Sequence, residues 1–141
     1  MCSNPDYRII HSMHQLTCGL AEVTFKELNE LYEKYGEEKG LRILAFPCNQ
    51  FGNSEPTTSK EIIDLATKIG IKFDLFEKVD VNGDHASPLW KFLKHKLKSD
   101  KGNFIKMNFT KFIINTNGVP VERHDAKVMP KDLISSIESL W

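Results

Sequence analysis

The hydrophobic pattern of the first half of the chain predicts a strand, a helix and a strand, in that order. Between residues 22 and 35 most of the apolar positions fall three or four apart, which predicts an amphipathic helix. They are Val23, Phe25, Leu28, Leu31, Tyr32 and Tyr35. Leu41–Phe46 is a short run that is apolar except for Arg42, and it predicts a buried strand. Ahead of the helix, Tyr7–Met13 is the candidate for a further strand, although His11 and Ser12 are unusual in a strand buried on both faces.

The second half begins with two helix-start signals. Thr58 and Glu61 have the spacing of a capping box, in which a hydroxyl and a carboxylate each accept from the other residue's backbone N–H. The helix that follows is predicted to bury Ile62, Ile63, Ala66 and Ile69. Ser87 followed by Pro88 predicts another start, with Ser87 as the capping hydroxyl. The buried face of that helix is predicted to be Leu89, Trp90, Leu93 and Leu97.

The remaining segments complete an α/β pattern. Phe73–Val81 is predicted to be extended, and Phe109–Ile114 and Val119–Arg123 flank an Asn-Gly pair, which predicts a β-hairpin. Pro130–Trp141 has the apolar spacing of a final amphipathic helix. Strands that alternate with helices imply parallel pairing, and the late hairpin adds antiparallel strands. We therefore expect an α/β three-layer sandwich with a mixed central sheet.

The composition is that of an ordinary globular protein. The chain has 141 residues, of which 40% are hydrophobic and 27% charged, and we expect a single domain over residues 1–141. Its formal net charge of +0 gives no electrostatic reason to expect nucleic acid as a partner. The first residues lack a basic segment followed by an apolar one, and no run approaches the ~18 apolar residues of a membrane span. The sequence therefore predicts a cytoplasmic protein without a signal peptide.

Cys18 is the candidate nucleophile. The three cysteines, Cys2, Cys18 and Cys48, are odd in number and widely spaced, which favours reduced thiols over a disulfide framework. Cys18 precedes the first predicted helix, where unpaired backbone N–H groups and the helix dipole stabilise a thiolate. The dipole contributes up to ~2 kcal/mol, or roughly 1.5 pKa units, so a reactive thiolate needs further donors. A buried core cysteine is the alternative interpretation of this position.

The segment Phe46-Pro47-Cys48-Asn49-Gln50-Phe51-Gly52 resembles a signature of the glutathione peroxidase family. That family carries a cysteine or selenocysteine followed by glycine before its first helix, then a short strand leading into this heptapeptide, an EP pair and a later WNF(T/S)KF motif. The corresponding segments here are Thr17-Cys18-Gly19-Leu20, Leu41–Gly52, Glu55-Pro56, Val81-Asn82-Gly83 and Met107-Asn108-Phe109-Thr110-Lys111-Phe112. The motifs occur in the family's order, and the similarity extends over roughly Leu16 to Arg123.

The resemblance implies a thioredoxin-like fold and a thiol peroxidase. Cys18 matches the residue that attacks the peroxide, and Gln50 and Asn108 match the amides that donate hydrogen bonds to it. Such donors favour the thiolate and polarise the hydroperoxide as charge develops. The implied activity is reduction of hydrogen peroxide and of organic or lipid hydroperoxides, through a sulfenic acid (a selenenic acid where the residue is selenocysteine). Glutathione is implied as the reducing co-substrate, with no other cofactor.

Two departures from the family's pattern leave an alternative open. Met107 occupies the position of a tryptophan that supplies a further N–H donor, and methionine cannot donate a hydrogen bond. Family members also carry an N-terminal hairpin and an apolar strand ahead of the catalytic loop, whereas Cys18 comes early here after a polar stretch, so that this strand region appears truncated. We therefore expect weaker activity than a complete site would give. The alternative is a truncated, catalytically weak isoform that acts as a redox-sensing or binding module.

The subclass and partners follow from three further features. Relatives that use thioredoxin carry a resolving cysteine in the second helix region, and 65–68 contains none, so the chain resembles a one-cysteine peroxidase that needs an external thiol, most simply glutathione. It also lacks the extra loop that tetrameric members use for assembly, and in both respects it is similar to the monomeric phospholipid-hydroperoxide type. The basic stretch from Lys91 to Lys111 is predicted to attract glutathione carboxylates or an anionic phospholipid surface, or to be a solvated face. His11, His14 and Cys18 do not have the spacing of a zinc signature, and we expect no metal site.

Overall fold

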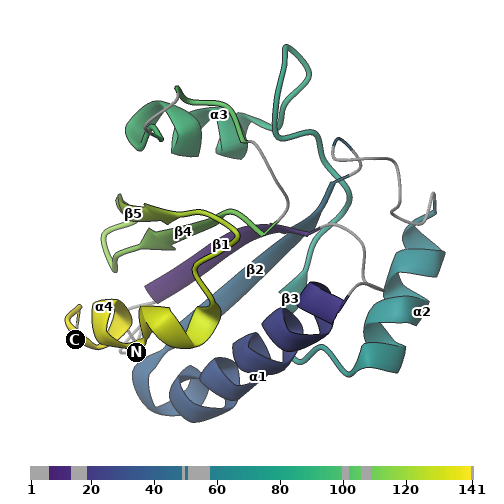
Figure 1. The fold of residues 1–141 in the computed structure, drawn as a ribbon, viewed down its shortest axis with the longest axis vertical. Helices are drawn as coiled ribbons and strands as arrows, with labels where there is room; N and C mark the ends of the chain where they lie inside the picture. The colour runs from purple at the N-terminus through teal and green to yellow at the C-terminus, as the bar shows by residue number, and fades with distance from the viewer. Residues whose placement is uncertain are drawn as a thin grey trace, which may run out of the picture.

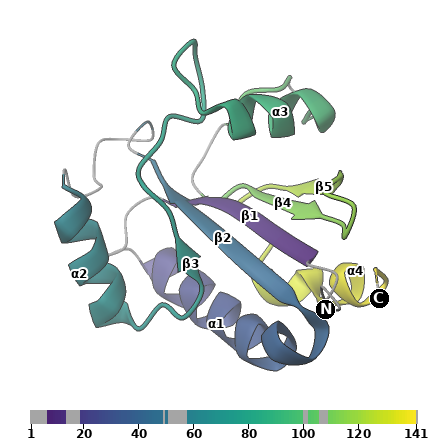
Figure 2. The ribbon, with the colours of Figure 1, turned by 180° about the vertical axis from the view of Figure 1, so that it is seen from behind.

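The computed structural model describes residues 7–13, 19–48, 50, 58–99, 102–105 and 109–140. The helices in this part of the chain are α1 (Gly19–Lys39), α2 (Ser59–Ile69), α3 (Pro88–Lys96), and a 3-10 turn η1 (Pro130–Leu133) that continues into α4 (Ile134–Glu138). Figure 1 shows α3 over one face of the central sheet and α1 and α4 over the other, and the view from behind in Figure 2 agrees. This arrangement confirms the predicted thioredoxin-like three-layer sandwich.

The described strands form one mixed sheet in the order β3-β2-β1-β4-β5. They are β1 (Tyr7–Met13), β2 (Leu41–Pro47), β3 (Asp74–Leu75), β4 (Lys111–Ile114) and β5 (Pro120–His124). The pairs β1–β2 and β2–β3 are parallel, while β1–β4 and β4–β5 are antiparallel. The polar stretch that was the weak candidate for a strand is therefore the central strand of the sheet, bonded on both sides.

Side chains on the two faces of the sheet belong to two separate cores. Along β2, Ile43 and Ala45 belong to the core beneath α1, and Leu44 and Phe46 pack in the core beneath α3. The α1 side gathers Phe25, Leu28, Leu31, Tyr35, Leu41, Phe73, Phe109, Ile113, Ala126, Leu133 and Ile137. The α3 side gathers Cys48, Val81, Trp90, Leu93, Ile105, Phe112 and Ile114. This alternation is what a strand covered on both faces requires, since successive side chains point to opposite sides.

The helix starts were predicted with mixed success. The Thr58 hydroxyl accepts from the Glu61 N–H at 3.2 Å and the Glu61 carboxylate accepts from the Thr58 N–H at 3.4 Å, which confirms the capping box. Ser87 precedes α3 as predicted, but its side chain makes no capping hydrogen bond. Two positions assigned to buried helix faces are wrong, because Val23 is 47% and Ile63 57% exposed. Each lies next in sequence to a buried residue of its helix, Thr24 for Val23 and Ile62 for Ile63.

The later segments have the predicted type of secondary structure, but the strand after α2 and the final helix are shorter than predicted. Of the extended segment 73–81, only Asp74–Leu75 pairs with β2 as a strand. The hairpin between β4 and β5 is confirmed, and Asn115 Oδ1 accepts from the Asn117 and Val119 N–H groups, both at 3.0 Å. Gly118 takes a positive φ of 79° in this turn, a conformation that L side chains rarely adopt. The final helix is short and begins as the 3-10 turn.

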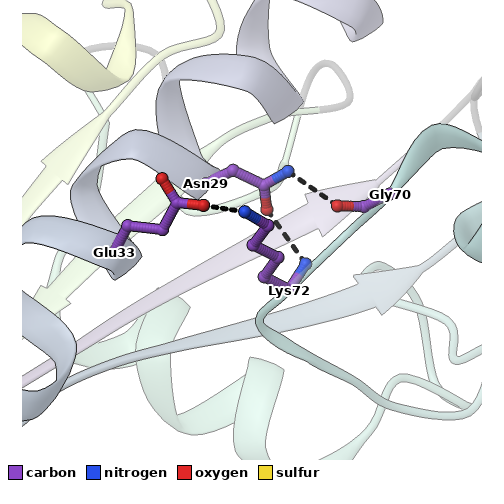
Figure 3. A network of polar contacts seen from close by, with 4 residues as sticks. All are labelled: Asn29, Glu33, Gly70 and Lys72. Atoms are coloured by element: carbon purple, nitrogen blue, oxygen red, sulfur yellow. Dashed lines mark hydrogen bonds and ion pairs between the residues drawn. The ribbon is translucent and has the colours of Figure 1, made fainter.

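A polar clamp fixes α1 against the segment that joins α2 to β3 (Figure 3). Asn29 Nδ2 donates to the Gly70 carbonyl at 2.9 Å, and Asn29 Oδ1 accepts from the Lys72 N–H at 3.0 Å. The Lys72 ammonium also pairs with the Glu33 carboxylate. One amide side chain therefore satisfies two backbone groups outside its own helix, which holds α1 in a fixed position relative to the sheet edge. No helix in the described part of the chain is both long and apolar enough to cross a bilayer.

Candidate active site

Three segments that carry the predicted site residues meet at one end of the sheet. The strand register pairs Met13 of β1 with Pro47 of β2, and His11 of β1 with Lys111 at the start of β4. The chain leaves β1 toward α1, leaves β2 toward Gln50, and enters β4 after Phe109 at this same end. Of the predicted residues, Gln50 is described, while Cys18, Met107 and Asn108 lie outside the described residues.

The side-chain amide of Gln50 is held by backbone groups of the segment before α3. Its Oε1 accepts from the Val81 N–H at 2.8 Å and from the Asn82 N–H at 2.9 Å, and its Nε2 donates to the Asn82 carbonyl at 2.9 Å. Cys48 Sγ lies 3.6 Å from the same Oε1. The amide therefore has one orientation, and one of its two N–H groups has no acceptor among the described residues. A fixed donor of this kind is what a reacting thiolate needs.

The backbone around Val81 lies beside Gln50 because it follows β2 past the end of the sheet. The Phe76 N–H donates to the Ala45 carbonyl at 2.9 Å, and the Val79 N–H donates to the Pro47 carbonyl at 2.9 Å. The next inward N–H, that of Val81, then meets the Gln50 side chain. Residues 76–81 are thus hydrogen-bonded to β2 and to Gln50 by a row of bonds, of which the first two join backbone groups and the third joins a backbone N–H to the Gln50 side chain.

Asn82 extends this network to the segment that leads toward β4. Its Nδ2 donates to the Ile105 carbonyl at 2.7 Å, and its Oδ1 accepts from the Ile105 N–H at 2.8 Å. Lys94 Nζ lies 3.4 Å from the same Oδ1. One asparagine therefore joins Gln50 to the described residue nearest before Met107 and Asn108. Sequence reasoning did not assign Asn82 this role, although its place in the Val81-Asn82-Gly83 motif was the available signal.

Phe109 has a strained backbone and packs against the helix that follows Cys18. Its φ is +61°, the one positive φ of a non-glycine residue in the described chain. A bulky residue in this region costs about 1–3 kcal/mol and persists only where its surroundings impose it. The buried Phe109 ring meets the Phe25 ring of α1 edge-on, with centroids 5.6 Å apart. The residue after Asn108 is therefore fixed to the helix whose first residue follows Cys18.

Lys111 lies in the interior, which corrects its assignment to a basic surface. Its side chain is 0% exposed and its Nζ donates to the Phe109 carbonyl at 2.8 Å. Burial lowers the pKa of Lys111 to about 8, while the carboxylates of Glu27 and Asp125 oppose that shift. Lys94 is also buried, and burial together with nearby Arg123 and Lys91 lowers its pKa. The exposed lysines of this stretch in the described chain are Lys91, Lys96 and Lys98.

Arg123 of β5 fastens the loop between α3 and β4. Its guanidinium donates to the carbonyls of Leu97 at 3.0 Å, Asn103 at 3.2 Å and Phe104 at 2.8 Å. It also lies 5.5 Å from the centroid of the Phe112 ring, and burial lowers its pKa. The loop that leads to the site is thereby attached to the far strand of the sheet.

The described residues contain no cluster of three histidine, cysteine or carboxylate side chains that could hold a metal. Cys48 is fully buried and packs within the α3-side core. What the arrangement provides chemically is a set of fixed amide groups at the end of the sheet where the chain enters α1.

The family model described as glutathione peroxidase matches residues 8–94. This range contains Cys18, the heptapeptide with Gln50, and the Val81-Asn82-Gly83 segment. The match therefore covers Gln50 and its partners Val81 and Asn82, while Ile105 lies beyond the matched range.

Individual proteins agree with that match. The chain is 44% identical over 124 residues to glutathione peroxidase 1 of Helianthus annuus, covering 87% of this chain and 74% of that one. It is 50% identical over 121 residues to phospholipid hydroperoxide glutathione peroxidase of Sapajus apella, covering 82% of this chain and 61% of that one. The crystal structure of T. cruzi GPX1 superposes with a TM-score of 0.78 at 31% identity, covering 97% of this chain and 82% of that one.

Proposed function

This chain belongs to the glutathione peroxidase family, and we propose that it reduces hydroperoxides through Cys18 with Gln50 and Asn108 as the donors that stabilise its thiolate. The observation that carries the proposal is the fixed Gln50 amide, held by Val81 and Asn82, with one N–H that has no acceptor among the described residues. A preorganised N–H is worth most where negative charge develops on sulfur and on the leaving oxygen. The relatives favour this enzyme over a redox-sensing module.

The reaction balances as a two-electron exchange. The Cys18 thiolate attacks one oxygen of the peroxide, the O–O bond breaks, and the leaving alkoxide takes a proton to become an alcohol or water. Cys18 is left as a sulfenic acid. One glutathione thiolate displaces hydroxide as water to form a mixed disulfide, and a second glutathione releases Cys18 as glutathione disulfide forms. Glutathione serves here as an external reductant, because α2 carries no cysteine that could resolve the sulfenic acid.

A coupled glutathione-dependent assay tests the reaction. We expect turnover with hydrogen peroxide and with a phospholipid hydroperoxide, complete loss of it in Cys18→Ser, and no loss in the matched control Cys2→Ser. After one equivalent of peroxide, mass spectrometry is expected to find the sulfenic acid, or its glutathione adduct, on Cys18. Absence of Cys18-dependent turnover with both peroxides would refute the proposal and leave the redox-sensing module in its place.

We propose further that the protein binds an anionic lipid surface, where it would meet lipid hydroperoxides. The surface formed by α3 and the following loop combines the exposed Lys91, Lys96 and Lys98 with Phe92 and Phe104, which are 42% and 47% exposed. Lys96 Nζ lies 5.9 Å from the Phe92 ring centroid. Basic residues beside exposed aromatic rings suit the headgroup region of an anionic membrane.

Vesicle sedimentation and gel filtration test that surface and the monomeric state. We expect binding to vesicles containing phosphatidylserine, little binding to phosphatidylcholine alone, and a monomer in solution. The double variant Lys96→Glu/Phe92→Ser is expected to lose binding, whereas Lys39→Glu, at the end of α1, is expected to retain it. Equal binding of both vesicle types, or of both variants, would contradict the proposal.

A further inference from the structure

Lys111 is the most deeply buried cation in the described chain, and its surroundings do not neutralise it. It begins β4 on the same face as Ile113, so its side chain lies between the sheet and α1. The carboxylates that influence it are Glu27 of α1 and Asp125 after β5, and neither forms an ion pair with its ammonium. Glu27 is engaged elsewhere, accepting from the Lys131 N–H at 3.1 Å. Burying such a charge costs free energy, which suggests that Lys111 has a structural or functional role that offsets this cost.

The hydrogen bond that the buried ammonium makes is to a strained residue. Lys111 Nζ donates to the Phe109 carbonyl at 2.8 Å, and Phe109 is the non-glycine residue with a φ of +61°. A charge-assisted hydrogen bond in a dry environment is roughly twice as strong as a neutral one. The bond therefore opposes the tendency of Phe109 to relax toward a negative φ, which would rotate the peptide groups on either side of it.

Two contacts thus hold Phe109 from opposite ends. Its carbonyl is held by Lys111, and its ring is held by Phe25, six residues into the helix that follows Cys18. A change in the Phe109 backbone would move the preceding residue, Asn108, relative to α1. The strained turn is the described feature that ties the two candidate site segments together.

We propose that Lys111 is a positioning residue for hydroperoxide reduction, holding the strained Phe109 turn that directly follows the proposed donor Asn108. This inference rests on the proposed function of Cys18 and Asn108. Among the described residues the Lys111 ammonium bonds a backbone carbonyl, that of Phe109, so its proposed action is through the backbone. The amine remains a donor in its neutral form, so the hydrogen bond persists when the proton is lost.

Lys111→Met tests the inference, because methionine has a similar length but neither the charge nor the donor. We expect the rate constant for oxidation of Cys18 by hydrogen peroxide to fall by about 10-fold or more, as for a displaced transition-state donor. Lys68→Met, on the exposed face of α2, is the matched control and is expected to react like the wild type. Thermal unfolding is expected to remain cooperative, since a buried charge replaced by an apolar residue of similar volume is often tolerated.

A double-mutant cycle separates positioning from general damage. If Lys111 acts through Asn108, Lys111→Met has no further effect in an Asn108→Ala background; an equal, additive loss in both backgrounds overturns the inference. A second readout needs no peroxidase turnover: site-resolved alkylation of Cys18 across pH is expected to show a higher thiolate pKa in Lys111→Met than in Lys68→Met. If Lys111→Met does not fold, Lys111→Leu, which also lacks the charge and the donor, carries the same predictions.

The outcomes distinguish the two levels of the hypothesis. A wild-type protein without Cys18-dependent turnover refutes the proposed function and the inference with it. An active wild type whose Lys111→Met variant reacts at the same rate, with an unchanged Cys18 thiolate pKa, refutes the inference alone.

Discussion

Gln50 and Asn82 bond each other in both directions: the Asn82 N–H donates to Gln50 Oε1 at 2.9 Å, and Gln50 Nε2 donates to the Asn82 carbonyl at 2.9 Å. The pair resembles a short piece of β ladder in which one peptide group is replaced by a side-chain amide. It determines which atom of Gln50 is the donor and fixes the orientation of the Gln50 amide. Gln50 is exposed to solvent, yet these hydrogen bonds fix the orientation of its side-chain amide.

Gln50→Glu tests this pair, because the carboxylate keeps the shape but loses both N–H groups. It can still accept from Val81 and Asn82, but it faces the Asn82 carbonyl without a donor and adds a negative charge near the proposed thiolate. We expect the rate of Cys18 oxidation by hydrogen peroxide to fall by ~10²-fold or more. Stopped-flow kinetics measure this rate. The control Asn117→Asp makes the same chemical change in the hairpin turn at the other end of β4, and a similar loss there would contradict the role of Gln50.

Thr58 and Ser87 provide a matched test of helix capping. Both are hydroxyl residues at the N-cap of a helix, but only Thr58 makes the side-chain cap bond. Thr58→Ala is expected to lower the free energy of unfolding by about 1 kcal/mol, and Ser87→Ala to change it by no more than a few tenths. Urea denaturation of both variants checks the difference. Equal losses would show that the Ser87 hydroxyl contributes in a way that the structure does not reveal.

The elements of this fold were predictable where periodicity and local chemistry agree. The capping box at Thr58 and the hairpin at Asn115 depend on neighbouring residues, so the sequence contains all of the information needed. The solvent-facing positions Val23 and Ile63 were assigned wrongly because an apolar residue beside a buried stripe does not reveal which face the sheet covers. The central position of β1 was likewise a tertiary outcome, since His11 and Ser12 give it a polar pattern.

The sequence was sufficient to predict which residues form the candidate site, but not which residues they contact. The heptapeptide identified Gln50, but its partners Val81 and Asn82 lie 31 and 32 residues away and meet it through the path of the chain along β2. Lys111 was counted with a surface stretch because lysine is mostly exposed in proteins. Its burial follows from the place of β4 beneath α1, which no local pattern expresses.

The buried ammonium of Lys111 predicts an unusual dependence of stability on pH. Its pKa is about 8 in the folded protein and about 10.5 when unfolded, so between these values the unfolded chain binds more protons. Stability attributable to this residue therefore rises with pH across that window and is lowest below pH 8. Relative to Lys111→Met, the wild type is expected to gain up to about 3 kcal/mol between pH 7.5 and 10.5.

Urea denaturation of both proteins at several pH values measures that gain. Lys68→Met serves as the control, because it makes the same substitution at an exposed position of α2. A wild-type curve that runs parallel to the Lys111→Met curve over the whole window would show that the Lys111 ammonium is hydrated, contrary to its burial.

Met107 provides the most direct test of how complete the site is. The family's tryptophan at this position supplies an N–H donor that methionine lacks, and loss of one preorganised donor typically costs ~10²-fold in rate. Met107→Trp is therefore expected to raise the rate constant for Cys18 oxidation, by up to about that factor. Met107→Phe is the matched control, because it adds an aromatic ring of similar thickness without the N–H. A gain in Met107→Trp alone would assign the deficit to the missing donor. Equal gains in both variants would assign it to packing, and no gain in either would show that Gln50 and Asn108 suffice for the reactivity that this chain has.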